Sequence, residues 1–154
     1  MRIIETLELS QENITFIQKL WNQEYPKKLC YDGISDFEKY LLQLKGQKHY
    51  LLVDDSDNIK GWGVIFERDA EKWFAIILDN SIHGLGYGTK LLNKLKEKEE
   101  KLSGWVIDHY TGLKQNGEYY MSPLNFYQKN GFDIKTGIRL ELEKISAVKI
   151  EWSF

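Results

Sequence analysis

The sequence has very little cysteine, no long apolar run and almost no net charge. A single cysteine, Cys30, rules out an internal disulfide and is typical of a reducing compartment. No apolar stretch approaches the ~18 residues that a membrane span needs, and residues 1–5 lack the apolar core of a secretion signal. A net charge of −2 gives no electrostatic footprint for nucleic acid or an anionic membrane. These absences predict a cytoplasmic protein with neither nucleic acid nor membrane as a partner.

The chain also lacks repeats, low-complexity segments and linkers. At 154 residues it is long enough to bury about two thirds of the surface of its unfolded form. We therefore expect one domain, 1–154. No catalytic motif surrounds Cys30, so an inert thiol is the better interpretation of that residue.

The most informative segment is the glycine-rich run from His83 to Thr89, His-Gly-Leu-Gly-Tyr-Gly-Thr. An apolar strand, 73–78, precedes it, and a helix with leucines on one face follows it to about residue 102. The first turn of a helix leaves about four N–H donors unpaired, and glycine has no Cβ to keep a ligand away. The run therefore predicts a phosphate-binding loop. The alternative is a tight turn whose glycines serve only the turn and helix packing.

Two common phosphate-binding motifs do not fit this spacing. The dinucleotide fingerprint G-x-G-x-x-G needs glycine where Thr89 stands, although Asp108 lies near the place of that motif's acidic residue. The nucleoside-triphosphate loop G-x-x-x-x-G-K-[ST] fails because Leu91 follows Lys90. The first motif is weakened and the second is excluded.

His83, Gly86 and Gly88 instead match the acyl-coenzyme A signature (Arg/Gln)-x-x-Gly-x-(Gly/Ala), with histidine in the first place. On this motif the chain resembles the GNAT superfamily of acyltransferases. Residues 122–132, Ser-Pro-Leu-Asn-Phe-Tyr-Gln-Lys-Asn-Gly-Phe, are similar to the family's late motif, Phe-Tyr-x-Lys-x-Gly-Phe. The two motifs stand in the family order, and the resemblance covers residues 50–140 well.

The resemblance implies an α+β fold, with a mixed, mostly antiparallel central sheet of about six or seven strands flanked by about four helices. The residue patterns favour strands at 2–8, 50–53, 61–66, 73–78, 105–107, 138–144 and 147–153. Ser10 is expected to cap a helix that runs to about residue 24, and Ser35, with Glu38, to start a second. Ser122, Pro123 and Gly131 have the positions of a cap, a first residue and a stop for the late helix.

The resemblance also implies where acetyl-coenzyme A binds. Its pyrophosphate would lie on the backbone N–H groups of the loop, and the backbone at Leu78 would stabilise the oxyanion that forms from the thioester carbonyl. His83 either contacts the phosphates as a weaker, pH-dependent donor than arginine or faces solvent, and Asn125 either hydrogen-bonds near the pantetheine or faces water. The expected coenzyme-binding residues are Leu78, His83, Gly84, Leu85, Gly86, Tyr87, Gly88, Thr89 and Asn125. No metal is expected.

Tyr127 matches the family tyrosine beside the leaving sulfur, and a phenol with a pKa near 10 can protonate a thiolate. The alternative for Tyr127 is a core aromatic residue. The strand 73–78 has no carboxylate to act as base, so Asp108 and His109 become the candidates; a turn cap and a loop residue are their alternative roles.

The loop 110–121 is unusually long, and such loops are often functional. We expect it to line the acceptor site together with residues 25–34; disordered polar surface is the alternative. The function implied is transfer of an acetyl group from acetyl-coenzyme A to a primary amine of a small molecule or peptide, by direct attack. A non-catalytic or regulatory coenzyme A-binding module remains the second hypothesis. The closing strands, at 139–153, could pair two subunits through an exposed edge and so form a homodimer. No residue in these strands decides between a monomer and a homodimer.

Overall fold

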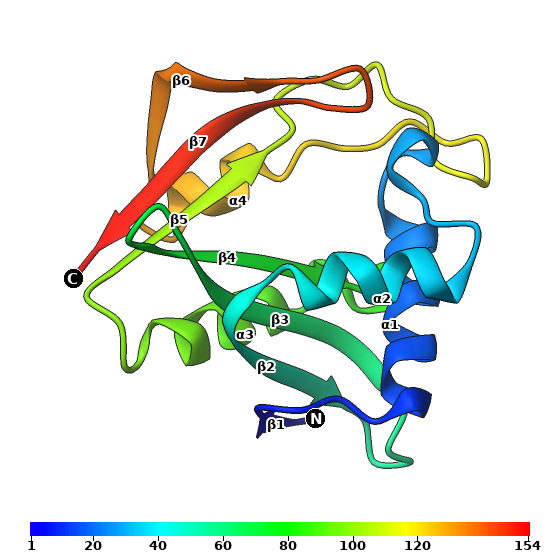
Figure 1. The fold of residues 1–154 in the computed structure, drawn as a ribbon. Coiled ribbons are helices and arrows are strands. Elements are labelled where there is room, and N and C mark those ends of the chain that lie inside the picture. Colours follow the sequence, from blue (N-terminus) through cyan, green and yellow to red (C-terminus); the bar gives the residue numbers. More distant parts are fainter.

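The computed structural model describes every residue from 1 to 154, and Figure 1 shows a central sheet with helices packed on it. The strands are β1 (Arg2–Thr6), β2 (Lys45–Val53), β3 (Ile59–Arg68), β4 (Glu71–Leu78), β5 (Lys101–Val106), β6 (Asp133–Glu141) and β7 (Ser146–Ser153). The helices are α1 (Gln11–Glu24), α2 (Ile34–Leu42), α3 (Tyr87–Lys96) and α4 (Leu124–Lys129), with short 3-10 turns at Lys27–Leu29 and Asn80–Ile82. The expected α+β fold is confirmed.

The strands β4 and β5 are the one parallel pair of the sheet, and they pair at a single position. The sheet order is β1-β2-β3-β4-β5-β7-β6, and all other neighbours are antiparallel. Trp73 of β4 pairs with Ser103 of β5, and beyond this point the two strands diverge toward their carboxyl ends (Figure 1). The last residues of β4 therefore have backbone groups on that side with no neighbouring strand.

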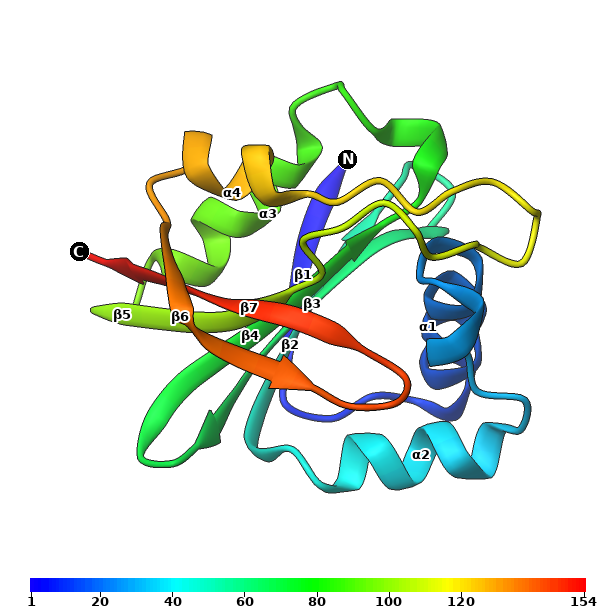
Figure 2. The same cartoon turned by 90° about the horizontal axis from the view of Figure 1, so that it is seen from above.

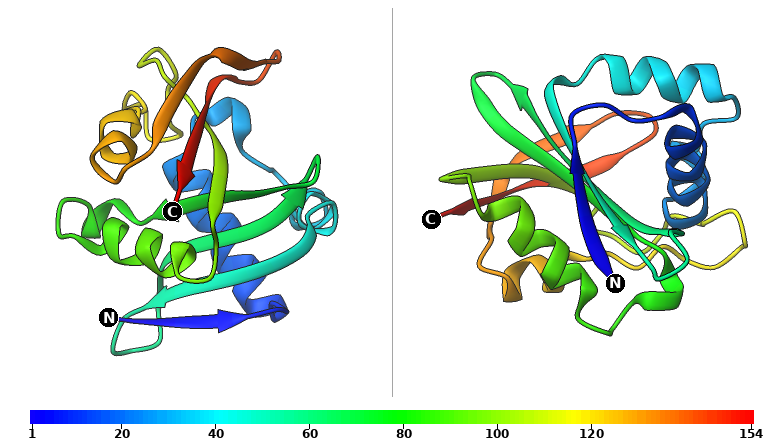
Figure 3. Two further views of the ribbon diagram at one scale, coloured as in Figure 1. Left: turned by 90° about the vertical axis from the view of Figure 1, so that its left-hand side faces the viewer. Right: turned by 90° about the horizontal axis from the view of Figure 1, so that it is seen from below.

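The two faces of the sheet have separate hydrophobic cores. Helices α1 and α2 cover one face, and α3 and α4 cover the other (Figure 3). Ile17 and Phe37 are fully buried on the first face, and Leu91, Leu92 and Leu95 on the second. Because burial of one such side chain contributes roughly 1.5–3 kcal/mol, apolar contact holds the helices on the sheet.

The helix after the glycine-rich run is shorter than expected. It ends at Lys96 rather than near residue 102, and Leu102 lies in β5, where it is fully buried. The intervening residues Glu97-Lys98-Glu99-Glu100 have no apolar side chain with which to hold another helical turn on the sheet. None of the helices is long and apolar enough to cross a membrane.

The expected first cap is confirmed and the second is wrong. Ser10 caps α1, because its side-chain oxygen accepts a hydrogen bond from the N–H of Asn13 (3.1 Å). Helix α2 begins at Ile34 with Gly33 in the capping position, so Ser35 lies inside the helix and makes no capping bond. The strand expected at 138–144 starts earlier and ends at Glu141, because residues 142–145 form the turn to β7.

Candidate functional site

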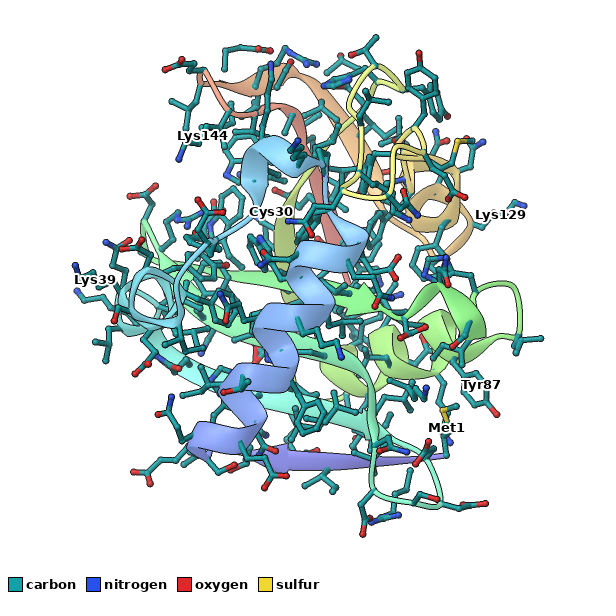
Figure 4. The ribbon with its side chains drawn as sticks, turned by 90° about the vertical axis from the view of Figure 1, so that its right-hand side faces the viewer. Met1, Cys30, Lys39, Tyr87, Lys129 and Lys144 are labelled. Carbon is teal, nitrogen blue, oxygen red and sulfur yellow. The ribbon has the colours of Figure 1, made fainter.

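A cleft of about 500 Å³ lies at the carboxyl end of β4. It is bounded by the glycine-rich loop, the end of α1, the segment before α4, and α4 itself. Figure 4 views the molecule with α1 in front; Tyr87, at the start of α3, and Lys129, at the end of α4, lie on the same side of α1. The lining residues are Glu24, Tyr25, Ile76, Ile77, Leu78, Ile82, His83, Gly84, Gly86, Gly88, Thr89, Tyr120, Met121, Pro123, Phe126 and Tyr127.

The glycine-rich loop has free backbone donors, and four of its residues, Gly84, Gly86, Gly88 and Thr89, line the cleft. None of the six N–H groups from Gly84 to Thr89 donates a hydrogen bond within the protein, whereas the N–H of Lys90 begins the helical pattern by bonding the carbonyl of Gly86 (3.1 Å). Gly84 and Gly86 have φ values of +75° and +86°, which residues with a Cβ rarely adopt. The loop is therefore a set of free donors at the positive end of a helix dipole.

Gly88 has a different reason to be glycine. A Cβ at this position would lie 3.1 Å from the ring of Phe126 in α4. The start of α3 and the helix that carries Tyr127 are thus in close contact.

The end of β4 is held by a histidine. The N–H of Asp79 donates to the carbonyl of Lys60 in β3 (2.8 Å). Because successive residues of a strand direct their backbone groups to opposite sides, the N–H and C=O of Leu78 point away from β3, toward the cleft. The Nε2 of His83 donates to the carbonyl of Leu78 (2.9 Å). The ring of His83 therefore lies against the strand end, while the N–H of Leu78 has no partner in the protein.

Tyr127 lines the cleft from α4 and is 6% exposed. Its ring packs edge-on against Phe74 of β4 with centroids 5.7 Å apart, and its hydroxyl makes no hydrogen bond within the protein. Burial, reinforced by Tyr25 and Tyr120, raises the pKa of Tyr127 well above its usual value of 10. The phenol is therefore protonated throughout the physiological pH range, and its proton is present to be donated, although the raised pKa also makes it a weaker acid than a free phenol.

Glu24 is the residue of the cleft that the sequence did not reveal. It is the last residue of α1, 7% exposed, and the only carboxylate among the lining residues. Its Oε2 accepts hydrogen bonds from the N–H of Asn80 (2.9 Å) and from the Nε2 of Gln23 (2.7 Å). The expected acceptor region began one residue later, at Tyr25, and a glutamate at a helix end carries no motif that would have drawn attention to it.

Asp108 and His109, the expected base candidates, do not line the cleft. The guanidinium of Arg139 donates to both carboxylate oxygens of Asp108 (2.8 and 3.0 Å) and lowers its pKa. The Nδ1 of His109 lies 2.9 Å from the hydroxyl of Thr111. A carboxylate held by arginine is a weak base, so this placement does not support the expected role.

The long loop before α4 is ordered and reaches the cleft. Leu113 and Tyr119 form an isolated antiparallel β-bridge, so residues 112–120 make a small hairpin. The N–H of Lys27, just after α1, donates to the carbonyl of Leu113 (2.7 Å) and joins this hairpin to the end of the helix. Figures 1 and 2 show the loop extending to this helix end. Tyr120 and Met121 of this loop line the cleft, and of the region 25–34 only Tyr25 does; that these residues contact the acceptor stays a prediction.

Three expected coenzyme-binding side chains lie outside the cleft lining: Leu85, Tyr87 and Asn125. Leu85 is 65% exposed and Asn125 is exposed. The N–H groups of Leu85 and Tyr87 have no acceptor in the protein, but neither residue lines the cleft. No group of three or more His, Cys, Asp or Glu side chains is placed to hold a metal ion.

Comparison with known proteins identifies the class. The sequence model of the acetyltransferase (GNAT) domain matches residues 46–134, more than half of the chain. The chain therefore belongs to the GNAT family, the acetyl-coenzyme A-dependent N-acetyltransferases, as its two motifs indicated. None of the curated proteins matches the sequence.

Solved structures of GNAT acetyltransferases share the whole fold at low sequence identity. An aminoglycoside 6'-N-acetyltransferase complexed with coenzyme A superposes with a TM-score of 0.73 at 16% identity, over 99% of this chain and 97% of that chain. A second aminoglycoside 6'-acetyltransferase, type Ii, gives 0.72 at 15% identity, over 99% and 97%. A spermidine N-acetyltransferase from Vibrio cholerae gives 0.66 at 16% identity, over 99% and 95%.

Proposed function

We propose that this protein, acting as one acyl-coenzyme A-binding domain over residues 1–154, transfers an acetyl group from acetyl-coenzyme A to a primary amine of a small molecule or peptide by direct attack. One observation carries the proposal: Leu78, with its free N–H, and Tyr127, with its free hydroxyl, line the same cleft as four loop residues whose N–H groups are free, namely Gly84, Gly86, Gly88 and Thr89. The aminoglycoside and spermidine acetyltransferases with the same fold act on amines, which supports this acceptor class.

The donor loop fits a diphosphate. The residues Gly84, Gly86 and Gly88 leave the approach free of Cβ atoms, since nothing lies within 4 Å of where a Cβ of the first two would be. Unpaired N–H groups at a helix N-terminus bind phosphate oxygens well. The backbone from residue 84 to residue 89 would therefore hold the pyrophosphate of the coenzyme, and the hydroxyl of Thr89 adds a donor on the same side.

Leu78 and Tyr127 would act on the thioester end. Bound acetyl-coenzyme A supplies the acetyl group on a thiolate leaving group. The N–H of Leu78 donates to the carbonyl oxygen and stabilises the negative charge that gathers there during attack. His83 fixes the strand end through the carbonyl of the same residue. Tyr127 gives its proton to the departing sulfur.

Acetyl-coenzyme A consumption with a panel of primary amines tests the proposal. We expect the wild-type protein to acetylate at least one amine, and Tyr127→Phe to lower kcat about 100-fold while calorimetry shows unchanged coenzyme A binding. Unchanged turnover in the variant would contradict the role of Tyr127. Coenzyme A binding without turnover of any amine would favour a non-catalytic module, and no binding would contradict the proposal as a whole.

The cytoplasm remains our predicted location, because a single cysteine is typical of a reducing compartment. A homodimer through the exposed edge strand β6 stays a prediction, and size-exclusion chromatography with light scattering checks it.

A further inference from the structure

Glu24 is a buried carboxylate in an unfavourable place. It is the last residue of α1, where the helix dipole is negative, and the side-chain amide of Gln23 links it to a second carboxylate, Asp79 (3.4 Å). The nearest cation is the Nζ of Lys114, 3.7 Å from Oε1 and outside hydrogen-bond distance. One carboxylate oxygen, Oε2, is fixed by two donors, whereas Oε1 has only this loose partner. Glu24 therefore brings to the cleft a carboxylate oxygen that has no hydrogen-bond donor within the protein, and such convergent polar groups mark binding sites.

Glu24 is also close to the reacting end of the cleft. Its Oε2 is bonded to the N–H of Asn80, two residues after Leu78. Two residues of chain span at most about 7 Å, so the carboxylate is anchored beside the backbone group that faces the thioester carbonyl.

The surroundings of Glu24 define a place for a cation. Tyr25, the next residue along the chain, and Tyr120, whose pKa is raised by burial and by the charge of Glu24, line the same cleft with ring centroids 6.3 Å apart. Met121 adds an apolar side chain to the lining. The faces of aromatic rings attract an ammonium group. Lys114 is 11% exposed and belongs to the hairpin 112–120 that packs on the end of α1. Its ammonium group lies 3.7 Å from Oε1, which shows that a cation can approach this oxygen of Glu24.

We infer that Glu24 binds the ammonium group of the acceptor and takes its proton, that Lys114 competes for this place in the acceptor-free protein, and that the acceptor carries no carboxylate on its amino-bearing carbon. The inference rests on the proposed function. Lys114 is the one cation at this place, and an ammonium group bound to Glu24 displaces it. No lysine or arginine lines the cleft itself, so a carboxylate beside the amino group would then lie against Glu24 without a partner.

The proton transfer balances as follows. An N–H bond of the ammonium breaks and an O–H bond forms on Glu24, so that the amine nitrogen keeps an electron pair. That pair forms the bond to the acetyl carbon while the carbon–sulfur bond breaks, and Tyr127 protonates the sulfur. The second proton lost by the nitrogen goes to water, from which Tyr127 regains its own. Glu24 then releases its proton to water, so that one proton is released in each turnover. A base is needed because, at pH 7, only about one alkylammonium in 2,500 is neutral in water.

The pH dependence of Glu24→Gln tests the base. We expect kcat/KM for an alkylamine at pH 7 to fall about 100-fold or more, and the loss to shrink as the pH approaches 10, where the amine is neutral without help. Calorimetry should show unchanged coenzyme A binding, and Glu12→Gln, on the exposed side of the same helix, should behave as the wild type. The titratable groups that surround Glu24 are Lys114, Tyr25, Tyr120, Tyr127, Asp79 and His83.

Two further measurements need no change at Glu24. Lys114→Met should lower KM for the amine about fivefold, because a loose competitor is removed; a purely structural ion pair would leave KM unchanged or raise it. In the wild type, phenethylamine should exceed phenylalanine, and tyramine should exceed tyrosine, by about 100-fold in kcat/KM.

The outcomes separate this inference from the proposed function. If the wild-type protein acetylates no amine, the proposed function fails. If the wild-type protein acetylates an amine but Glu24→Gln keeps its kcat/KM at pH 7, the assignment of Glu24 as the base is wrong. The assignment is also wrong if the loss of kcat/KM in Glu24→Gln does not shrink at high pH. If the amino acids match their amines, the acceptor class is wrong. If Glu24→Gln does not fold, the Lys114 variant and the paired acceptors still decide.

Discussion

At the residue scale, His49 shows how a buried histidine is held neutral. It is fully buried in β2, where its Nδ1 accepts a hydrogen bond from the Nε1 of Trp62 (3.1 Å). Because the indole only donates, the proton of the ring must be on Nε2, which lies 2.7 Å from Oε1 of Gln47. Burial lowers the pKa of His49 from 6.5 to about 4.

This shift predicts a loss of stability in mild acid. Below pH 6.5 the unfolded chain binds a proton at His49 that the native protein does not bind until about pH 4, so the free energy of unfolding falls across this window. The contribution is about 3 kcal/mol. Urea unfolding at a series of pH values, compared with His49→Gln, which keeps an acceptor for Trp62, measures it. Equal pH slopes in the two proteins would contradict the assignment.

At the element scale, the N-termini of α1 and α2 differ in how they begin. Ser10 caps α1 through its side chain, whereas α2 begins after Gly33 with no side-chain cap. The sequence around Ser35 has capping-box spacing, yet the amphipathic face of α2, with Phe37 and Leu41 buried, fixes where the helix starts. Tertiary packing has overridden a local signal.

The two serines are therefore a matched pair for stability measurement. Ser10→Ala removes a bond to the N–H of Asn13 and should cost about 1 kcal/mol of unfolding free energy. Ser35→Ala removes no cap and should stay within about 0.5 kcal/mol of the wild type. Chemical denaturation of both variants checks the contrast. A cost at Ser35 equal to that at Ser10 would show that the local motif acts after all.

The sequence allowed prediction of the elements whose signal is local. The Ser10 cap, the loop from His83 to Thr89 and the late helix before Gly131 each depend on a few neighbouring residues, and the structure has all three. The end of α3 was misjudged because Leu102 fits a helical spacing and a buried strand equally well. Short apolar runs do not distinguish the two.

At the scale of the whole molecule, the divergence of β4 from β5 separates the sheet into two parts that share one core. Phe74 of β4 packs against Phe132 with centroids 5.3 Å apart, and Leu102 and Ile150 of the second part are buried in the same cluster. The helices α3 and α4 therefore hold the sheet together where strand pairing stops.

This divergence predicts an alternating pattern of hydrogen exchange. The N–H of Ile77 lies on the β3 side of β4, and the N–H of Leu78 lies on the cleft side without a partner. In the free protein the amide of Leu78 should exchange much faster than that of Ile77, and coenzyme A should protect it together with the amides of 84–89. NMR-detected exchange with and without coenzyme A measures both. Protection of Leu78 without coenzyme A would contradict the arrangement.

The candidate site shows the limit of prediction from spacing along the chain. The loop amides follow one another in sequence, so the motif was sufficient to find them. Glu24 reaches the cleft only because α1 ends beside Asn80, 56 residues later in the chain. Asp108 is bound by Arg139 of β6, 31 residues later in the chain, and does not line the cleft. Contacts across such separations depend on the whole fold and leave no local signal.

The contact between Gly88 and Phe126 has a mechanical consequence. Tyr127 is the next residue along α4, so the segment that would grip the diphosphate and the group that would protonate the sulfur are parts of one rigid piece. The protein thereby fixes the distance between the site for the diphosphate and the site for the thioester. An acyl thioester without the nucleotide would contact only the second site, so its transfer would be slower and its binding weaker than those of acetyl-coenzyme A.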